Sequence, residues 1–173
     1  EKINYMLELR ASNEDIVAPY ALEFESAQFV QGKRPWEMKV DIALPCATQN
    51  ELDAGDAEKL IANGCICVCE GANMPCTPEA IEKLQQNQIL YAPGKAANAG
   101  GVATSGLEMA QNSMKINWPR SEVDRRLHEI MENIHLACVE HGTEEDGYVN
   151  YVNGANIAGF MKVANAMLDQ GVI

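Results

Sequence analysis

Two adjacent glycines, Gly100 and Gly101, precede a helical pattern whose early residues include Ser105. Glycines in this place let backbone N–H groups approach a ligand closely, and a helix N-terminus attracts anions such as a carboxylate or a phosphate. We expect Ser105 in the first helical turn, where its hydroxyl donates to that anion. A tight turn has the same pattern, with the glycines permitting close packing and Ser105 bonding a neighbouring carbonyl. The pattern by itself leaves both interpretations open.

A group of cysteines is the second candidate site, because four of the six stand close together: Cys65, Cys67, Cys69 and Cys76. Alternate residues of a strand lie about 6.6 Å apart. A tetrahedral zinc ion with Zn–S bonds of about 2.3 Å needs its sulfurs roughly 3.8 Å apart, so one strand cannot supply three ligands to one ion. We therefore expect reduced, buried, structural thiols and no metal site.

The histidines are weaker candidates. His128 and His135 share a predicted helix with Glu132 and stand nearly two turns apart. Two ligands on one helix face need a spacing of three or four residues, so an amphipathic helix with solvated histidines is the better interpretation. The chain has neither a Ser-His-Asp order nor a nucleophile elbow, and so carries no hydrolase signal.

Helices and strands must position these residues, and those at the start of the chain are predicted to be short. Apolar residues at helical spacing over residues 1–25 predict two helices, the second capped by Ser12 or Asn13. Two strand-like runs follow, over residues 27–30 and 39–44.

Strands and helices then alternate. We expect a helix over 51–63 ended by Gly64, a strand over 65–69 buried on both faces, a helix from Thr77 to about Gln86 and a strand over 88–91. Helices of this length suit right-handed crossovers, so the pattern predicts an open parallel α/β sheet. Ligands of such sheets bind at the carboxyl ends of the strands, which are here the turns 45–50, 70–73 and 93–95.

The rest of the chain is predicted to be helical. We expect helices over 101–112, over 122–140 behind a capping pattern formed by Ser121 and Asp124, and over 157–170.

Composition narrows the possible functions. The chain has 173 residues, of which 47% are hydrophobic and 22% charged, as in an ordinary folded domain. Its formal net charge of −12 argues against nucleic acid and against an anionic membrane surface as partners. We see neither an apolar run of about 18 residues nor a secretory signal, and expect a cytoplasmic protein.

Three segments around the predicted strand ends are the most specific feature of the sequence. They are IALPCATQNEL at 42–52, EGANMP at 70–75 and APGKAANAGGVATSGLEM at 92–109. Together they resemble glutamate dehydrogenase, in its NADP-preferring, hexameric bacterial group. A weaker similarity continues through residues 131–134 and 153–160, so the resemblance covers essentially the whole chain.

The resemblance implies a reaction and a substrate site. A glutamate dehydrogenase transfers a hydride between L-glutamate and NADP, or less expectedly NAD, giving 2-oxoglutarate and ammonia, and also runs the reverse amination. The family works as a homo-oligomer, a hexamer. By the same resemblance Ser105 would bind the side-chain carboxylate of the substrate, and Val102 would pack on its methylenes beside Gly101.

The resemblance also implies a coenzyme site. Asn73 and Asn98 match positions that approach the nicotinamide half of the coenzyme, and Ala47 and Thr48 would line the same cleft.

Other parts of the family pattern are not in this sequence. The family's catalytic Lys and Asp belong to an amino-terminal substrate domain, and no G-x-G-x-x-G run follows a predicted strand here. We therefore expect no catalytic residue in this chain, which looks like the carboxyl-terminal portion of the enzyme. Residues 1–117 would form the second half of a Rossmann-like dinucleotide-binding domain, and residues 118–173 a helical segment packed on it. Alone, the chain is expected to be inactive and to bind NADP weakly.

Two other classes of function stay open at this point. One is a non-catalytic, nucleotide-binding-like or regulatory module that keeps the same half-Rossmann shape. The other is a thiol or metal protein built on the four clustered cysteines.

Overall fold

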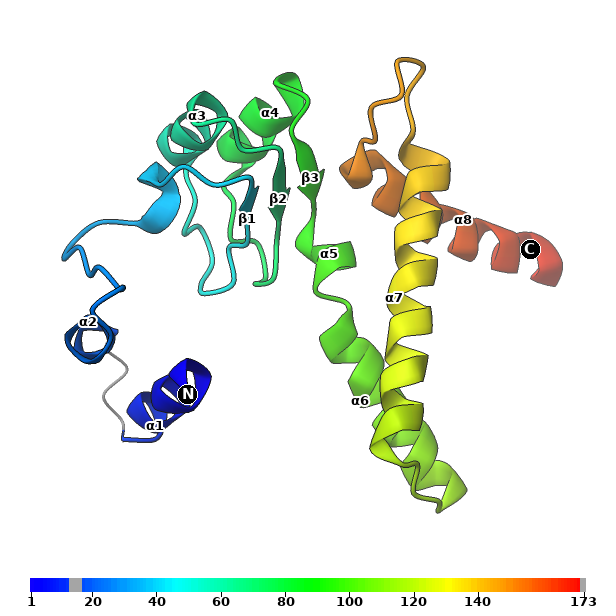
Figure 1. Cartoon of the computed structure of the whole chain (residues 1–173). Coiled ribbons are helices and arrows are strands. Elements are labelled where there is room, and N and C mark those ends of the chain that lie inside the picture. Colours follow the sequence, from blue (N-terminus) through cyan, green and yellow to red (C-terminus); the bar gives the residue numbers. More distant parts are fainter. Residues whose placement is uncertain (13–16, 172–173) are drawn as a thin grey trace. The chain divides into compact units, whose positions relative to one another are not determined.

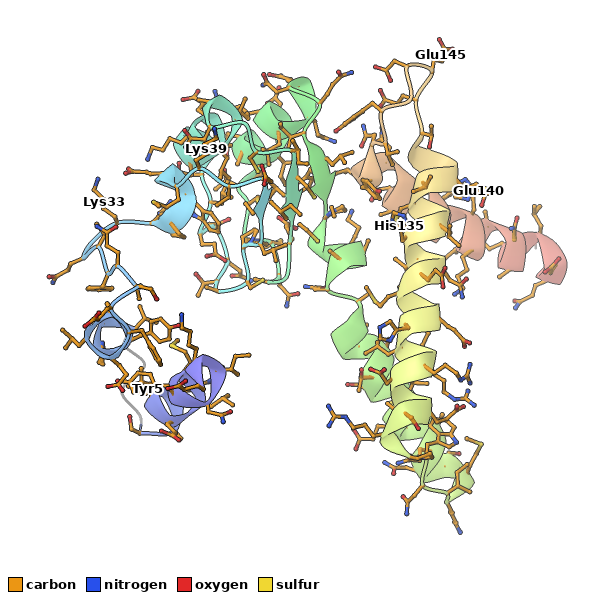
Figure 2. The ribbon with its side chains drawn as sticks, viewed as in Figure 1. Tyr5, Lys33, Lys39, His135, Glu140 and Glu145 are labelled. Atoms are coloured by element: carbon orange, nitrogen blue, oxygen red, sulfur yellow. The ribbon has the colours of Figure 1, made fainter. Side chains whose placement is uncertain are left out.

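The computed structural model describes residues 1–12 and 17–171 and contains two compact units, Glu1–Pro35 and Trp36–Ile173. The first unit holds helices α1 (Lys2–Ala11) and α2 (Ala18–Glu23) (Figure 1). Tyr5 on α1 packs edge-on against Phe24, with ring centroids 5.5 Å apart, and lies 6.2 Å from the ring of Tyr20 (Figure 2). The two predicted helices are confirmed, and an aromatic cluster holds them together.

Two expectations for the first unit are corrected. Ser12 does not cap α2, because it ends α1 and its hydroxyl donates to the Leu9 carbonyl at 2.7 Å, while Val17 precedes α2. Asn13 lies outside the described residues. The strand predicted over residues 27–30 is also wrong, since among the described residues no strand lies alongside this segment to pair with its backbone groups.

The second unit is built on three parallel strands in the order β1-β2-β3 (Figure 1). The strands are β1 (Ile42–Ala43), β2 (Cys67–Cys69) and β3 (Leu90–Ala92), joined by α3 (Ala54–Ala62) and α4 (Pro78–Gln86). A short helix, η1 (Pro35–Glu37), precedes β1 and buries Trp36. The predicted open parallel α/β sheet flanked by helices is confirmed.

The crossover helices begin where the sequence supplies caps. The Asp53 carboxylate accepts hydrogen bonds from the backbone N–H groups of Gly55 at 2.9 Å and Asp56 at 3.1 Å, and the Asp56 side chain caps Asp53 in return. Thr77 caps α4 directly before Pro78, and α4 has the predicted bounds. Both helices pack on one face of the sheet around apolar side chains that are fully buried, among them Leu52, Leu60, Val68, Leu84 and Tyr91.

The opposite face of the sheet is less covered than the sequence predicts. Val68 is completely buried, but Cys67 and Cys69 are half-buried, and Ile66 just before the strand is 61% exposed. The strand over 65–69 is therefore not buried on both faces, because α3 and α4 cover one face and, in the described part, α8 contacts the sheet at β3.

Four helices follow the sheet (Figure 1): α5 (Gly94–Ala97), α6 (Gly100–Met114), α7 (Arg120–Gly142) and α8 (Tyr151–Gln170). The helix α7 packs along α8 and also contacts α6. The α6–α7 contact runs across the predicted domain boundary at residue 117, which stays a prediction. No helix within residues 1–12 and 17–171 has the length and apolar character needed to cross a membrane.

Two helix starts differ from the predictions. Pro119 precedes the first turn of α7, so Ser121 and Asp124 lie inside the helix and form no cap. The helix α8 begins at Tyr151 and not near Ile157, because the Asn150 side chain accepts a hydrogen bond from the Asn153 N–H at 3.1 Å and caps it earlier.

Candidate functional site

The loops after the three strands meet at one edge of the sheet. The backbone N–H groups of Gly71 and Ala72 donate to the Pro45 carbonyl at 3.0 and 3.1 Å, which joins the loop after β2 to the loop after β1. The Glu70 N–H donates to the Ala92 carbonyl at 3.0 Å and joins the same loop to the end of β3. Parallel pairing therefore brings together segments that lie far apart in the sequence, as the sheet topology requires.

A polar cavity of about 510 Å³ opens between the first two of these loops, and we call it the loop cavity. Its lining includes Ala47, Thr48 and Asn73, three of the four residues assigned to a coenzyme by resemblance. Gly71 forms part of its wall, where an added Cβ would overlap the Cys46 sulfur. A side chain at position 71 would therefore require the Cys46 thiol to turn away from this wall.

The fourth residue, Asn98, lies beside the same loop. It ends α5, and its Nδ2 donates to the Asn73 Oδ1 at 2.7 Å and to the Ala72 carbonyl at 3.1 Å. The structure therefore brings the four residues into one neighbourhood at the carboxyl ends of the strands. Their roles toward a coenzyme stay predictions.

The residues predicted to hold a substrate lie on α6. Gly101, Val102 and Ser105 are all exposed, and Val102 is 73% exposed. Because α6 starts at Gly100, Ser105 lies in the second turn and not in the first. Its hydroxyl donates to the Gly101 carbonyl at 3.3 Å, which is the local bond of the plainer interpretation. An anion site at the helix N-terminus is therefore not formed by Ser105 in this arrangement.

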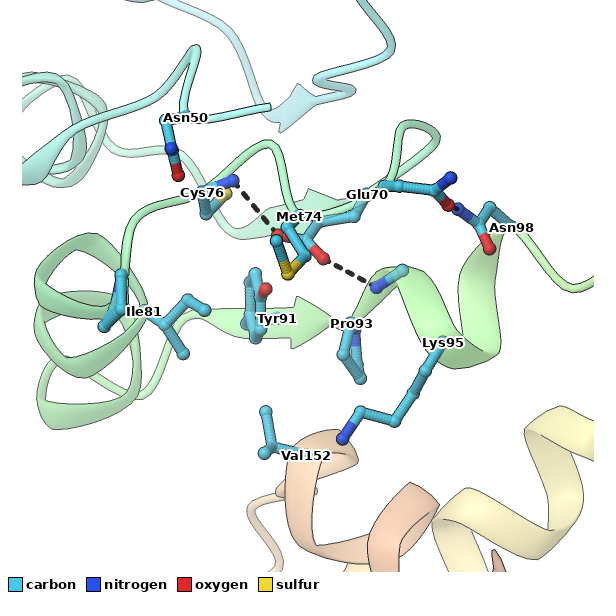
Figure 3. Close-up of a pocket in the computed structure, with 13 residues that line it drawn as sticks. Asn50, Glu70, Met74, Cys76, Ile81, Tyr91, Pro93, Lys95, Asn98 and Val152 are labelled. Atoms are coloured by element: carbon cyan, nitrogen blue, oxygen red, sulfur yellow. Dashed lines mark hydrogen bonds between the residues drawn. The ribbon is translucent and has the colours of Figure 1, made fainter. Parts of the chain in front are cut away.

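A second, mainly apolar cavity of about 650 Å³ lies on the α4 and α8 side of the same loops, and we call it the inner cavity (Figure 3). Apolar side chains from α4, β3 and α8 line it, including Ile81, Tyr91 and Val152. At its edge the Lys95 Nζ donates to the Asn156 Oδ1 at 2.6 Å. The sequence did not predict this cavity.

Glu70, on the wall of the inner cavity, is a charged residue that the sequence analysis missed as a site residue. It is 4% exposed, and its carboxylate accepts backbone N–H bonds from Gly94 at 2.6 Å and from Cys76 at 3.2 Å (Figure 3). Burial, reinforced by this carboxylate, raises the pKa of the Tyr91 hydroxyl and of the Cys76 thiol. Both groups therefore stay protonated and able to donate. An acidic residue directly after a buried strand was the available signal.

The six cysteines are free thiols that differ in exposure. Cys65 and Cys76 are buried as expected, Cys67 and Cys69 are only half-buried, and Cys46 at the loop cavity is exposed. Burial raises the pKa of four of the thiols, those of Cys67, Cys69, Cys76 and Cys138. Within the described part of the chain no group of three or more His, Cys, Asp or Glu side chains is placed to hold a metal ion.

Two histidines of α7, His128 and His135, are on its exposed surface, whereas His141 in its last turn is half-buried. The His128 side chain is 78% exposed, and its Nδ1 lies 2.9 Å from the Asp124 carbonyl. His135 is exposed and stacks on Tyr151 of α8, with ring centroids 5.8 Å apart. The expectation that His128 and His135 are solvent-exposed is therefore confirmed.

A parallel sheet with crossover helices places the chain in the open α/β class, and its polar cavity lies at the carboxyl ends of the strands, where proteins of this class bind ligands. Residues 2–171 match the model of the Glutamate/Leucine/Phenylalanine/Valine dehydrogenase family. The chain belongs to this family.

Within this family, the similar proteins include several glutamate dehydrogenases. The chain is 66% identical over its whole length to the NAD-specific glutamate dehydrogenase of Bacteroides fragilis and 61% identical to the NADP-specific glutamate dehydrogenase of Escherichia coli. It covers 39% and 38% of those two proteins. Among solved structures, glutamate dehydrogenase of Plasmodium falciparum matches 99% of this chain and 37% of its own, with a TM-score of 0.91 and 43% identity. The chain thus spans less than half the length of these relatives.

Proposed function

We propose that this chain is the coenzyme-side part of a glutamate dehydrogenase, which converts L-glutamate to 2-oxoglutarate and ammonia and catalyses the reverse amination. The observation that carries the proposal is the gathering of Ala47, Thr48 and Asn73 around the loop cavity, with Asn98 bonded to Asn73. These residues come from three separate strand-end loops of a family fold, at the edge where such sheets bind ligands.

The donor set at the loop cavity fits a nicotinamide coenzyme. Amide side chains pair well with a carboxamide, since each offers an N–H donor and a carbonyl acceptor. The hydrogen bond from Asn98 fixes the orientation of the Asn73 amide, so that little ordering remains to be done when a ligand binds. The coenzyme, when bound, accepts or supplies the hydride. The residues of this chain bind and orient it.

The residues proposed to bind the substrate lie on α6. Ser105 is proposed to turn its hydroxyl from the Gly101 carbonyl to the side-chain carboxylate of glutamate, while Val102 contacts the methylenes beside Gly101. The exposure of Val102 and Ser105 supports this assignment, because both are accessible to a ligand. The catalytic groups are proposed to lie outside this chain, and the chain alone is proposed to be inactive. The active protein is proposed to be a cytoplasmic hexamer.

We propose NADP as the preferred coenzyme, on the resemblance of the strand-end segments to the NADP-preferring group. The names of the relatives include both NAD-specific and NADP-specific enzymes, so the coenzyme preference has to be measured from reaction rates with each coenzyme. We expect the full-length protein that carries this chain to oxidise NADPH with a higher kcat/KM than NADH, in the presence of 2-oxoglutarate and ammonia. A higher value with NADH would reverse the coenzyme preference and leave the reaction standing.

Cys46 provides a chemical test of the coenzyme site. It is the exposed thiol among the six and lines the loop cavity, so in the full-length protein we expect iodoacetamide to alkylate it first among these six thiols at neutral pH. Saturating coenzyme should slow this alkylation at least about tenfold by covering the cavity, as measured by peptide mass spectrometry. The Cys46→Ala variant is the control, and it should lose the fast phase of labelling. Labelling that coenzyme leaves unchanged would contradict a coenzyme at this cavity.

A further inference from the structure

We propose that Glu70 is a positioning residue whose buried carboxylate holds the loops after β2 and β3 together, so that Asn73 and Asn98 are correctly placed to bind the coenzyme. This inference rests on the proposed function. It assigns to Glu70 no contact with coenzyme or substrate, because Glu70 acts through the segments that it joins.

The carboxylate connects two segments that are distant in sequence. Its Oε2 accepts the Gly94 N–H at the start of α5, and its Oε1 accepts the Cys76 N–H after the β2 loop (Figure 3). The Tyr91 hydroxyl and the Cys76 thiol also interact with it. One carboxylate thus bridges the loop after β2 and the first residue of α5.

Together with the contacts of α5, these bonds form a closed ring of hydrogen bonds and backbone that includes Asn73 and Asn98, the predicted coenzyme residues. From Gly94 the chain turns through α5, where the Asn98 N–H donates to the Gly94 carbonyl at 2.9 Å. The Asn98 side chain then bonds back to Ala72 and Asn73, which directly follow Glu70 and Gly71. If the carboxylate no longer accepted the Gly94 N–H, α5 would be free to move, and the hydrogen bond between Asn98 and Asn73 would be weakened.

The atoms around this ring are closely packed, so a change at Glu70 is expected to displace its neighbours. A Cβ on Gly94 would lie 2.9 Å from the Ala72 carbonyl and 3.1 Å from the Glu70 Oε2. The two loops therefore touch where the carboxylate joins them, and a change at Glu70 is passed on to Ala72 and its neighbours.

A charge in this place is not needed for packing alone. Burying a carboxylate is unfavourable unless hydrogen bonds compensate it, and apolar residues often stabilise a core as well or better. Its advantage is that bonds to a charged acceptor are roughly twice as strong as neutral ones and fix their donors more firmly. The two backbone N–H groups that the Glu70 carboxylate accepts, one from each segment that it joins, match this use.

The test is Glu70→Gln in the full-length protein, with coenzyme affinity measured by NADPH fluorescence. Glutamine has nearly the same shape but places an N–H₂ group opposite one of the two backbone donors. We expect the Kd for coenzyme to rise at least about tenfold, which corresponds to about 1.4 kcal/mol. The KM for 2-oxoglutarate at saturating coenzyme should stay within about twofold, since α6 is not part of the ring.

The matched control is Asp56→Asn. Asp56 is also a buried carboxylate, 5% exposed against 4% for Glu70, and it also accepts a backbone N–H, but in the capping box of α3. This variant should lower the melting temperature and leave the coenzyme Kd within about twofold. An unchanged Kd in Glu70→Gln, or an equal rise in Asp56→Asn, would overturn the inference.

A milder variant keeps the test decisive if Glu70→Gln does not fold. Tyr91→Phe retains the buried ring and removes only the hydroxyl that interacts with Glu70. It should raise the coenzyme Kd about two- to fivefold, and an unchanged Kd would count against the inference. A parent protein that binds no coenzyme at all would overturn the proposed function itself. Normal binding by the parent with no effect of these variants would overturn only the role of Glu70.

Discussion

Replacement of Ser105 by alanine is expected to raise the KM for glutamate about ten- to hundredfold, with the KM for coenzyme changed less than about twofold. A hydrogen bond to a charged group contributes about 1.5–3 kcal/mol, and the substrate carboxylate is the charged partner proposed for this hydroxyl. Initial rates of the full-length protein, with each ligand varied in turn, measure both values.

Thr104→Ala is the matched control for this prediction. Thr104 is the neighbouring exposed residue of α6, and its hydroxyl makes the same kind of bond, to the Gly100 carbonyl at 2.9 Å. It has no proposed contact with substrate, so its removal should leave the glutamate KM unchanged. Equal KM values for the Ser105 variant and the parent would remove Ser105 from the substrate site. Equal increases in both variants would point to a general disturbance of α6.

Gly154→Ala is expected to destabilise the packing of α7 on α8 by about 1–3 kcal/mol or more. Gly154 is buried, and an added Cβ would overlap the backbone carbonyl of Cys138 on α7. Backbone atoms of a helix cannot rotate aside as a side chain can, so the helices must separate to admit the methyl group. A lower melting temperature, followed by circular dichroism, is the expected result.

The same helix provides the control. Gly159 lies on α8 with no heavy atom within 4 Å of an added Cβ, so Gly159→Ala should be neutral or stabilising by roughly 0.5–1 kcal/mol. The difference between the two variants isolates the close helix contact from helix propensity. Similar melting temperatures for Gly154→Ala and Gly159→Ala would show that the two helices do not depend on this contact.

Local signals in the sequence predicted the crossover helices well. The Thr77 cap with Pro78 set the start of α4, and Gly64, with a φ of +83°, follows the end of α3 as a terminating glycine should. Predictions that depend on a neighbouring segment of the fold were less successful. Residues 27–30 have the composition of a strand but no described neighbouring strand, and β2 lacks a full cover on its second face.

The candidate site was only partly accessible from the sequence. The rule that ligands bind at strand ends correctly grouped Ala47, Thr48 and Asn73, because parallel topology alone brings those ends together. The place of Glu70 directly after a strand was a signal, but the two backbone groups that it binds lie 6 and 24 residues away, so the sequence did not show what it would contact. Ser105 was placed one turn too early because the start of a glycine-led helix is difficult to fix without a capping side chain.

The most direct test of the central claim is NADPH oxidation with 2-oxoglutarate and ammonia, measured side by side on this chain alone and on the full-length protein. We expect activity in the full-length protein and none in the chain alone, since the catalytic groups are proposed to lie outside it. Turnover by the chain alone would contradict the proposal that it supplies only the coenzyme side. Activity in neither would contradict the proposed reaction and favour a non-catalytic module that retains this fold.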